Sequence, residues 1–312
     1  MVGLGLRPDG LDLVHVDLSE GQTPPKLKVF SSIDCRDLKE QSRVLHDAVR
    51  QFGLGRCRCV GVLSPASYSL LQVEPPSVPE AELRSAVRWQ IKDLISFPLE
   101  DAVVDAFLVP NPENRARNPL AYVVAAPKSV VRRQAELILA ARMKVAAINI
   151  PEMALRNLAT LFPEDEKGVA TLYLGPEGGV ITLSRQGQLY LSRNITISAT
   201  ALANLCSEGE SADPANLELR LQDLLDSIVL EIQRSLDFYE SNFGQAPVGT
   251  LVVMPTEQKI PPLLPYLQSY LGVEVRSLDL DTILELPELP AGQAARSLLA
   301  IGAVLRNEMG RS

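Results

Sequence analysis

The chain has 312 residues, of which 46% are hydrophobic and 22% are charged, and its formal net charge is -8 with a pI near 5.0. Such a length favours two domains or two lobes over one small core. The acidic balance, with lysines and arginines well mixed among the acids, argues against a nucleic-acid-binding surface. Because the N-terminus lacks a signal-peptide pattern and no segment approaches ~20 consecutive apolar residues, we expect a soluble cytoplasmic protein.

The N-terminal part predicts an antiparallel meander followed by a helix and a further strand. Apolar runs on both sides of Arg7-Pro8-Asp9-Gly10 are typical of a hairpin. The next helix is predicted from the three-or-four-residue spacing of its apolar side chains, and Gly53 supplies its left-handed cap. The expected strands cover 2–6, 11–16, 26–33 and 58–63, and the helix covers 38–52.

A proline-rich stretch then begins a helix that contains the only tryptophan. Ser77 and Glu80 have the spacing of a capping box, which predicts a helix start there. An apolar stripe continues to Leu94, and Phe97-Pro98 ends the run. Trp89 projects away from this stripe. Farther along, we expect a loop at 110–119, strands at 120–125 and 145–150, and helices at 129–143 and 151–161.

The second half repeats the order of elements in the first half. Three short strands, a long helix with an apolar face and another strand are expected at 168–174, 179–184, 189–195, 217–243 and 250–253, and a last helix at 295–306. This internal duplication indicates an α/β protein built of two similar lobes. The seam is expected near 162–166, where Glu164-Asp165-Glu166 is predicted to be a solvated turn.

Several motifs, taken in order, resemble a known family. They are Pro-x-x-Glu-Leu at 79–83, Ala-Val-Arg-Trp at 86–89, Ile-x-Phe-Pro-Leu-Glu-Asp at 95–101, Arg-Ser-x-x-Phe-Tyr at 234–239 and a helix of small residues ending at Arg306. The chain is similar to the pilus-assembly protein PilM, and most of all to the shorter MSHA biogenesis protein MshI. The resemblance implies an actin-like (ribonuclease H-like) fold of two lobes, related to the cell-division protein FtsA. It places the first lobe at 1–162 with an inserted α+β subdomain at about 69–145, and the second lobe at 163–312 with a small helical region at about 198–245.

The resemblance also implies two phosphate-binding hairpins, and this chain departs from both. The matching glycines are Gly3 and Gly5 in the first hairpin and Gly175, Gly178 and Gly179 in the second. Gly5 stands at the position of an aspartate, Arg7-Pro8 replace a glycine and a serine, and Asp12 stands at the position of a lysine. Tyr173 replaces the second acid, and Met254-Pro255 stand where the adenosine glycines belong. Because proline removes an amide donor and the metal-anchoring acids are missing, we expect a degenerate site with no catalytic residue, no metal ligand and no cofactor, and with ATP and magnesium as the disfavoured alternative.

Other residues capable of chemistry are isolated in the sequence. His15 and His46 have no carboxylate, serine or cysteine partner at motif spacing, so we interpret both as structural. Cys57 and Cys59 share one face of an expected strand, which is poor disulfide geometry, and they lack the second ligand pair of a zinc site. We interpret the glycine-rich segment 175–179 as a plain hairpin.

The resemblance implies that the insert takes part in binding a partner protein. Arg88, Trp89 and Phe97 are expected to line a groove between the insert and the first lobe, which in the family receives the cytoplasmic tail of PilN, a bitopic inner-membrane protein. The alternative is that Trp89 packs under the insert's sheet, since aromatic residues serve both cores and peptide grooves.

The hypothesis is therefore a non-catalytic scaffold at the cytoplasmic face of the inner membrane, in an MSHA-type pilus platform, with a PilN-like partner. The alternative function is an ATP-binding switch or weak ATPase in pilus or type II secretion assembly, whose GspL component shares the fold. Homodimerisation stays open.

Overall fold

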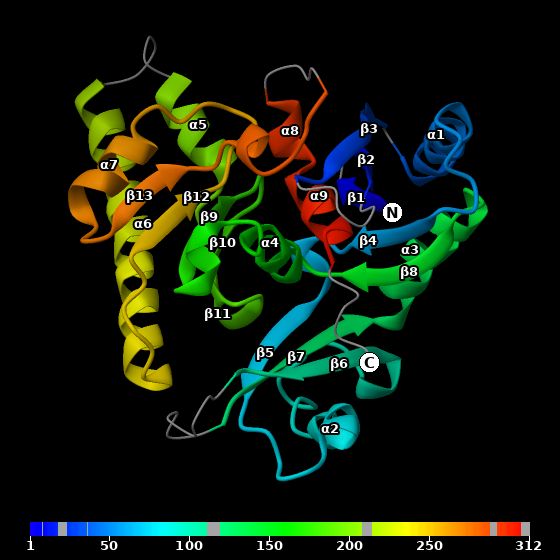
Figure 1. Cartoon of the computed structure of the whole chain (residues 1–312), viewed down its shortest axis with the longest axis horizontal. Helices are drawn as coiled ribbons and strands as arrows, with labels where there is room; N and C mark the ends of the chain where they lie inside the picture. Colours follow the sequence, from blue (N-terminus) through cyan, green and yellow to red (C-terminus); the bar gives the residue numbers. More distant parts are fainter. Residues whose placement is uncertain are drawn as a thin grey trace. The chain divides into compact units, whose positions relative to one another are not determined.

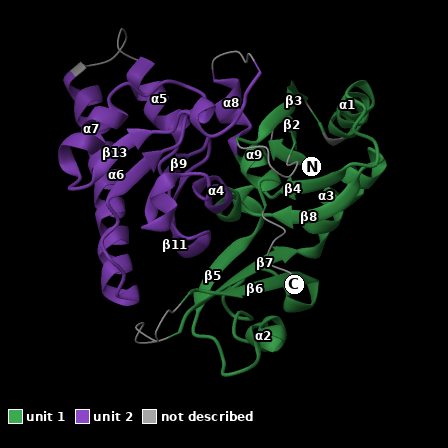
Figure 2. Ribbon diagram, viewed as in Figure 1, with its two compact units in different colours: residues 1–154, 299–312 green, residues 155–298 purple. Residues whose placement is uncertain are grey.

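The computed structural model describes residues 1–7, 9–17, 24–35, 37–110, 119–207, 214–287 and 292–306. The chain forms two compact units, one of residues 1–154 with 299–312 and the other of residues 155–298 (Figure 2). Pro8 and most of the predicted loop at 110–119 lie outside the described residues. None of the described helices is both long enough and apolar enough to span a membrane.

The first unit is built on a five-stranded sheet of order β3-β2-β1-β4-β8 (Figure 1). Its strands are β1 (Val2–Arg7), β2 (Gly10–Asp17), β3 (Lys26–Asp34), β4 (Arg58–Val62) and β8 (Lys144–Asn149). The first three strands form the predicted antiparallel meander, whereas β4 runs parallel to β1 and β8 parallel to β4. The predicted elements at 2–6, 11–16, 26–33, 38–52, 58–63 and 145–150 are thus confirmed in type.

Two helices cover one face of this sheet, α1 (Leu38–Gln51) and α3 (Lys128–Ala140). Their apolar faces and the sheet form one core cluster, which includes Leu45, Ile138 and Leu13. Asp37 caps α1 by accepting hydrogen bonds from two backbone amides of its first turn, and Gly53 follows the helix at φ 66°, as predicted. On the opposite face, Val60 and Val62 pack with Ala154 of α4 (Pro151–Ala159) and with Ala303.

The C-terminal segment returns to the first unit, so the division differs from the predicted boundary at 162/163. Residues expected to form one helix at 295–306 form α8 (Gln293–Arg296) and α9 (Leu298–Val304). A Cβ atom on Gly3 would lie 2.2 Å from the carbonyl oxygen of Ala300 and 2.7 Å from Val304. The bare glycine backbone of β1 therefore allows α9 to pack on the first sheet, which periodicity along the chain does not encode.

The insert is a three-stranded antiparallel sheet of order β5-β7-β6. Its strands are β5 (Ser69–Val73), β6 (Ala102–Leu108) and β7 (Ala121–Pro127). The insert sheet ends at Pro127, because α3 and β8 pair and pack with the first sheet. The predicted end at about 145 is therefore too late.

The helix of the insert, α2 (Glu80–Val87), is shorter than predicted. Its N-cap residue is Pro79, and no side chain caps it, so the expected capping box of Ser77 and Glu80 is wrong. Beyond Val87 the chain continues in single turns, with the amide of Leu94 bonded to the carbonyl of Ile91. These turns still bury Ile91 in the cluster beneath the insert sheet, so tertiary packing replaces the regular helix.

The second unit repeats the plan with a sheet of order β11-β10-β9-β12-β13. Its strands are β9 (Val169–Leu174), β10 (Gly179–Arg185), β11 (Gln188–Ile195), β12 (Thr250–Val253) and β13 (Glu274–Ser277). The first three are antiparallel and the last two are parallel to β9, as in the first unit. The helices are α5 (Ala199–Ser207), α6 (Pro214–Phe243) and α7 (Leu263–Tyr270). The duplication predicted from the order of elements is confirmed.

The acidic run near the seam is not the solvated turn that was predicted. Asp165 is 7% exposed and accepts a 2.7 Å hydrogen bond from the amide of Gly187, and burial raises the pKa of its carboxyl. Glu164 accepts two bonds from Arg276, at 2.9 and 3.1 Å. Burial opposes ionisation of Glu164, but these bonds hold its pKa below the usual range. A left-handed turn at Gln186 and Gly187 offers the amide, so Glu164 and Asp165 are folded into the unit, whereas Glu166 is exposed.

Candidate functional site

The turn between β1 and β2 is built around the guanidinium of Arg7. Its Nη1 lies 2.6 Å from Asp9, its Nε 3.1 Å from Asp12 and its Nη2 3.2 Å from Asp34. The Asp12 side chain is 3% exposed, whereas those of Asp9 and Asp34 are 67% and 74% exposed. One cation is thus shared by three carboxylates, and the turn keeps a net negative charge.

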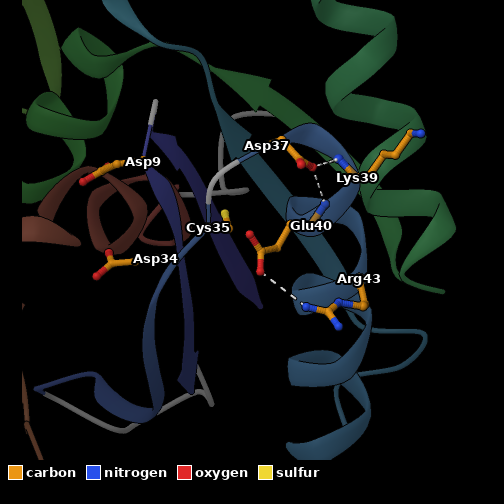
Figure 3. Close-up of a pocket in the computed structure, with 7 residues that line it drawn as sticks. All are labelled: Asp9, Asp34, Cys35, Asp37, Lys39, Glu40 and Arg43. Carbon is orange, nitrogen blue, oxygen red and sulfur yellow. Dashed lines mark hydrogen bonds and ion pairs between the residues drawn. The ribbon is translucent and has the colours of Figure 1, made fainter.

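An open hollow of about 1080 Å³ adjoins this turn (Figure 3). It is lined by Asp9, Asp34, Cys35, Asp37, Lys39, Glu40 and Arg43. The carboxylate of Asp37 is bonded to the start of α1, and Glu40 pairs with Arg43 at 3.3 Å. Lys39 points away from the acids in Figure 3. No group of histidine, cysteine and acidic side chains among the described residues is arranged to hold a metal ion.

The second glycine-rich turn closes on itself. The amide of Gly175 donates to the carbonyl of Gly178 at 2.7 Å, and the amide of Ala199 donates to the carbonyl of Gly175 at 2.8 Å. A Cβ atom on Gly179 would lie 2.7 Å from the carbonyl oxygen of Tyr173. These contacts form the β9–β10 hairpin, with α5 beginning beside it.

The three predicted partner-binding residues of the insert have different environments. Arg88 donates to the carbonyl of Leu99 at 2.5 Å and to that of Ala102 at 3.5 Å, so its side chain connects the end of α2 to the start of β6. Phe97 is half-buried against the insert core. Trp89 is 73% exposed, which shows that the alternative of Trp89 packing under the sheet is wrong. Trp89 alone of the three offers a large free surface.

A second hollow, of about 490 Å³, lies where the insert joins the first sheet, and we call it the root groove. It is lined by Leu6, Arg7, Gln41, Val62, Leu63, Ser64, Ser67, Ser129, Val130, Arg133 and Gln134. Its floor is the carboxyl end of the parallel strands β1 and β4, where open α/β sheets usually bind their ligands. None of the three residues predicted to line a groove at the insert contributes to this one.

The root groove contains a buried acceptor that has no partner. Gln134 is 2% exposed and donates from Nε2 to the carbonyl of Val62 at 2.9 Å, but its Oε1 has no hydrogen bond among the described residues. An unsatisfied buried acceptor costs about 1–3 kcal/mol, so this oxygen favours a ligand that brings a donor. The sequence signal was available but unused: Gln134 is a polar residue four positions from both Val130 and Ile138 on an apolar helix face.

Donors and polar groups lie at the rim of the root groove. Arg133 donates to Oε1 of Gln41 at 3.3 Å, and Gln41 in turn donates to the carbonyl of Arg7 at 3.2 Å. The α3 helix begins at the rim after Pro127 with no side-chain cap and no acid in its first turn. A helix start of this kind favours an electronegative atom nearby. The groove thus combines an apolar floor, one inner acceptor and several outer donors.

A hydrogen bond to a buried glutamate joins two segments of the chain beside the root groove. Tyr68, directly before β5, donates a 2.6 Å hydrogen bond to Glu152 in the first turn of α4. Glu152 is fully buried, and burial raises the pKa of its carboxyl; burial and the neighbouring Glu152 also raise the pKa of Tyr68. The bond connects the root of the insert to the core of the first unit.

Comparison with solved structures finds proteins of similar fold. No protein-family model and no curated protein matches the chain. A solved structure of a PilM-PilN type IV pilus biogenesis complex is similar, with 21% identity over 97% of both chains and a TM-score of 0.71. A Bacteroides thetaiotaomicron protein of unknown function with an actin-like ATPase fold matches 96% of this chain and 94% of its own, with 10% identity and a TM-score of 0.52.

The chain has an actin-like fold. The two units, each with three antiparallel strands followed by two parallel ones, are the two lobes expected of that fold. In this actin-like chain, the positions expected to cradle phosphate carry the Arg7 cluster and the plain hairpin at Gly175–Gly179, while the root groove lies at the insert.

Proposed function

We propose that this protein is a non-catalytic scaffold of a type IV pilus platform, of the MSHA kind, and that its root groove binds the cytoplasmic tail of a PilN-like inner-membrane protein. Through that partner it is held at the cytoplasmic face of the membrane. The carrying observation is the root groove, with its buried free acceptor, in a chain that matches the PilM-PilN structure over 97% of both lengths.

The shape and chemistry of the root groove suit a short extended peptide. A volume of about 490 Å³ fits a few side chains, and the floor of Leu6, Val62 and Leu63 takes apolar ones. A backbone amide or a side-chain amide of the peptide satisfies Oε1 of Gln134. The peptide's carbonyl groups accept from Arg133 and from the start of α3. Main-chain hydrogen bonds give affinity, and the apolar floor gives selectivity.

The phosphate-binding role expected of the fold does not fit the residues of the first turn. The Arg7 cation is already engaged by three carboxylates. The adjacent hollow adds two further acids, Asp37 and Glu40, and two cations, Lys39 and Arg43, so the acids remain in excess. At Gly3 the space beside the backbone is filled by Ala300 and Val304. A triphosphate would meet like charge here, which supports the proposal that no nucleotide is turned over. The alternative is an ATP-binding switch in pilus or type II secretion assembly.

The test is calorimetric titration of a peptide copying the tail of the PilN-like protein from the same organism. Wild type should bind it. Gln134→Met keeps the side-chain volume but removes both Oε1 and the Nε2 donor to the carbonyl of Val62. This variant should bind about tenfold more weakly, as expected for a loss of about 1.4 kcal/mol. If the wild-type protein does not bind the peptide, the proposal is wrong. Melting temperatures of both proteins show whether the variant is folded.

Two further arms of this experiment separate the alternatives. Trp89→Ala tests the predicted contribution of Trp89: weaker binding places it in the contact, and unchanged affinity removes it while leaving the root groove. Addition of MgATP at about 100 times an assumed Kd would stabilise a nucleotide-binding protein by about 2.7 kcal/mol. We expect no rise in melting temperature, whereas a magnesium-dependent rise would favour the switch.

A further inference from the structure

The long helix α6 has an exposed stripe along the side opposite its buried face. Residues spaced by three or four positions form this outer stripe, which consists of Leu219, Asp223, Asp226, Leu230, Gln233, Asp237 and Glu240, all exposed. At 100° per residue they fall within an arc of about 100° on the helix. The face that carries Ile228, Ile232 and Tyr239 is buried in the second unit.

The outer stripe carries apolar side chains that nothing described covers. Leu219 is 59% exposed and Leu230 is 45% exposed, and their separation of 11 residues places them about 17 Å apart on one line. Helix α7 lies alongside α6 (Figure 1) and contributes Tyr270, which is 54% exposed. The backbone carbonyl of Tyr270 accepts from Gln233 at 3.3 Å, so the end of α7 lies beside the outer stripe.

The aromatic part of this surface is held by two contacts. The rings of Tyr266 and Tyr270 have centroids 4.5 Å apart, and the hydroxyl of Tyr266 donates to Asp226 at 2.6 Å. Ordered aromatic side chains lose little conformational entropy on binding and are frequent anchors of protein interfaces. Two leucines of α6 and the neighbouring Tyr270 of α7 therefore offer anchor points on this surface.

The charge of the outer stripe has one sign. It contains four carboxylates, those of Asp223, Asp226, Asp237 and Glu240, and no cation. Arg234, which borders the stripe three positions before Asp237, is paired with Glu231 at 2.9 Å. A surface that alternates apolar anchors with acids attracts a segment that alternates apolar residues with lysine or arginine.

We propose that the outer stripe of α6, with Tyr270 of α7, docks a cationic amphipathic helix of a partner protein. The partner's apolar residues, at three-or-four-residue spacing, contact Leu219, Leu230 and Tyr270, and its flanking cations pair with the acids, as in other helix-to-helix docking. Anionic lipid or nucleic acid would be repelled by the same acids, and so would the stripe of a second copy. This surface is in the second unit, so the inference stands independently of the root groove.

The experiment uses the full chain and a defined probe. The probe is a fluorescein-labelled 18-residue peptide of leucine and lysine with leucines at helical spacing, and its control is a scrambled peptide of the same composition. Anisotropy titrations at low and physiological salt give the affinities. Wild type should bind the amphipathic peptide at least about tenfold more tightly than the scrambled one, and binding should weaken with salt.

Matched variants test which surface is used. Leu219→Ser with Leu230→Ser removes the anchors, and Asp223→Lys with Asp237→Lys reverses the charge; each pair should weaken binding at least about tenfold. The controls are Leu139→Ser on α3, at 57% exposure, and Glu80→Lys with Glu82→Lys on α2, which changes the net charge equally. These controls should change affinity less than about twofold.

Three outcomes would overturn the inference. It fails if wild type prefers neither peptide, or if the leucine pair leaves the affinity unchanged. It also fails if the Glu80 and Glu82 pair weakens binding as much as the stripe acids, because general charge would then explain the attraction. Far-ultraviolet circular dichroism of every variant confirms that the helices are retained.

Discussion

The ion pair between Arg7 and Asp12 is the strongest test of the structure at the β1–β2 turn. We predict that Arg7→Met, which keeps an apolar stem but removes the cation, destabilises the protein because a carboxylate that is 3% exposed loses its counter-ion. At 3.1 Å and an effective dielectric constant of about 20, the attraction is about 5 kcal/mol. Much of it offsets the cost of removing both groups from water.

Breaking one side of such a buried pair costs about 3–5 kcal/mol, which is a large part of the total stability of a typical domain. The other two acids add little, since Asp9 and Asp34 are well exposed. Removing both partners in Arg7→Met with Asp12→Leu should recover most of the loss, because no buried charge then remains. The pair is therefore expected to show strong coupling in a double-mutant cycle.

Urea unfolding at neutral pH measures these effects as changes in the free energy of unfolding. The matched control is Arg43→Met, whose side chain is 70% exposed and pairs with Glu40 on the surface of α1. It should cost no more than about 0.5 kcal/mol. If Arg7→Met costs no more than Arg43→Met, or if the double variant is as unstable as Arg7→Met alone, the reasoning about the buried pair is refuted.

Two further predictions concern packing and pH. Gly3→Ala should lower the free energy of unfolding by about 1–3 kcal/mol, because its Cβ would lie 2.2 Å from the carbonyl oxygen of Ala300. Gly5→Ala, whose Cβ would have its nearest atom at 3.7 Å, should be tolerated. Equal melting temperatures of the two variants would contradict this prediction. Burial raises the pKa of Glu152 in the folded state, so that state keeps a proton which the unfolded chain has lost, and stability falls as pH rises above the unfolded pKa of about 4.3. In Glu152→Gln this fall should disappear. The unfolding free energy of the variant relative to wild type should therefore rise by up to about 1.4 kcal/mol per pH unit above pH 4.3. If the pH profiles of the two proteins are parallel, Glu152 is not responsible for the fall.

Local patterns in the sequence predict most of the regular elements. The apolar face of α6 is visible as a repeat of three and four residues, and the hairpin turns are marked by glycine. Signals of this kind act within a few residues, so the strands and long helices could be found without knowledge of the rest of the chain.

Features that depend on distant contacts were missed. Helix α2 stops at Val87, although Ile91 continues the four-residue spacing of Leu83 and Val87 and is buried with them beneath the insert sheet. Asp165 is buried because a turn 22 residues later offers an amide. The root groove unites β1, β4, α1 and α3, so no single stretch of sequence shows it. Only the polar Gln134 on an apolar helix face hinted at it.

Hydrogen exchange of the full chain, with and without a saturating amount of the PilN-like tail peptide, tests the central proposal most directly. Exchange reports the local opening of backbone amides. Our account predicts that the peptide protects residues 62–67 and 128–134, which surround the root groove. Protection confined to residues 84–97 around Trp89, or no protection at a concentration that saturates binding, would contradict it.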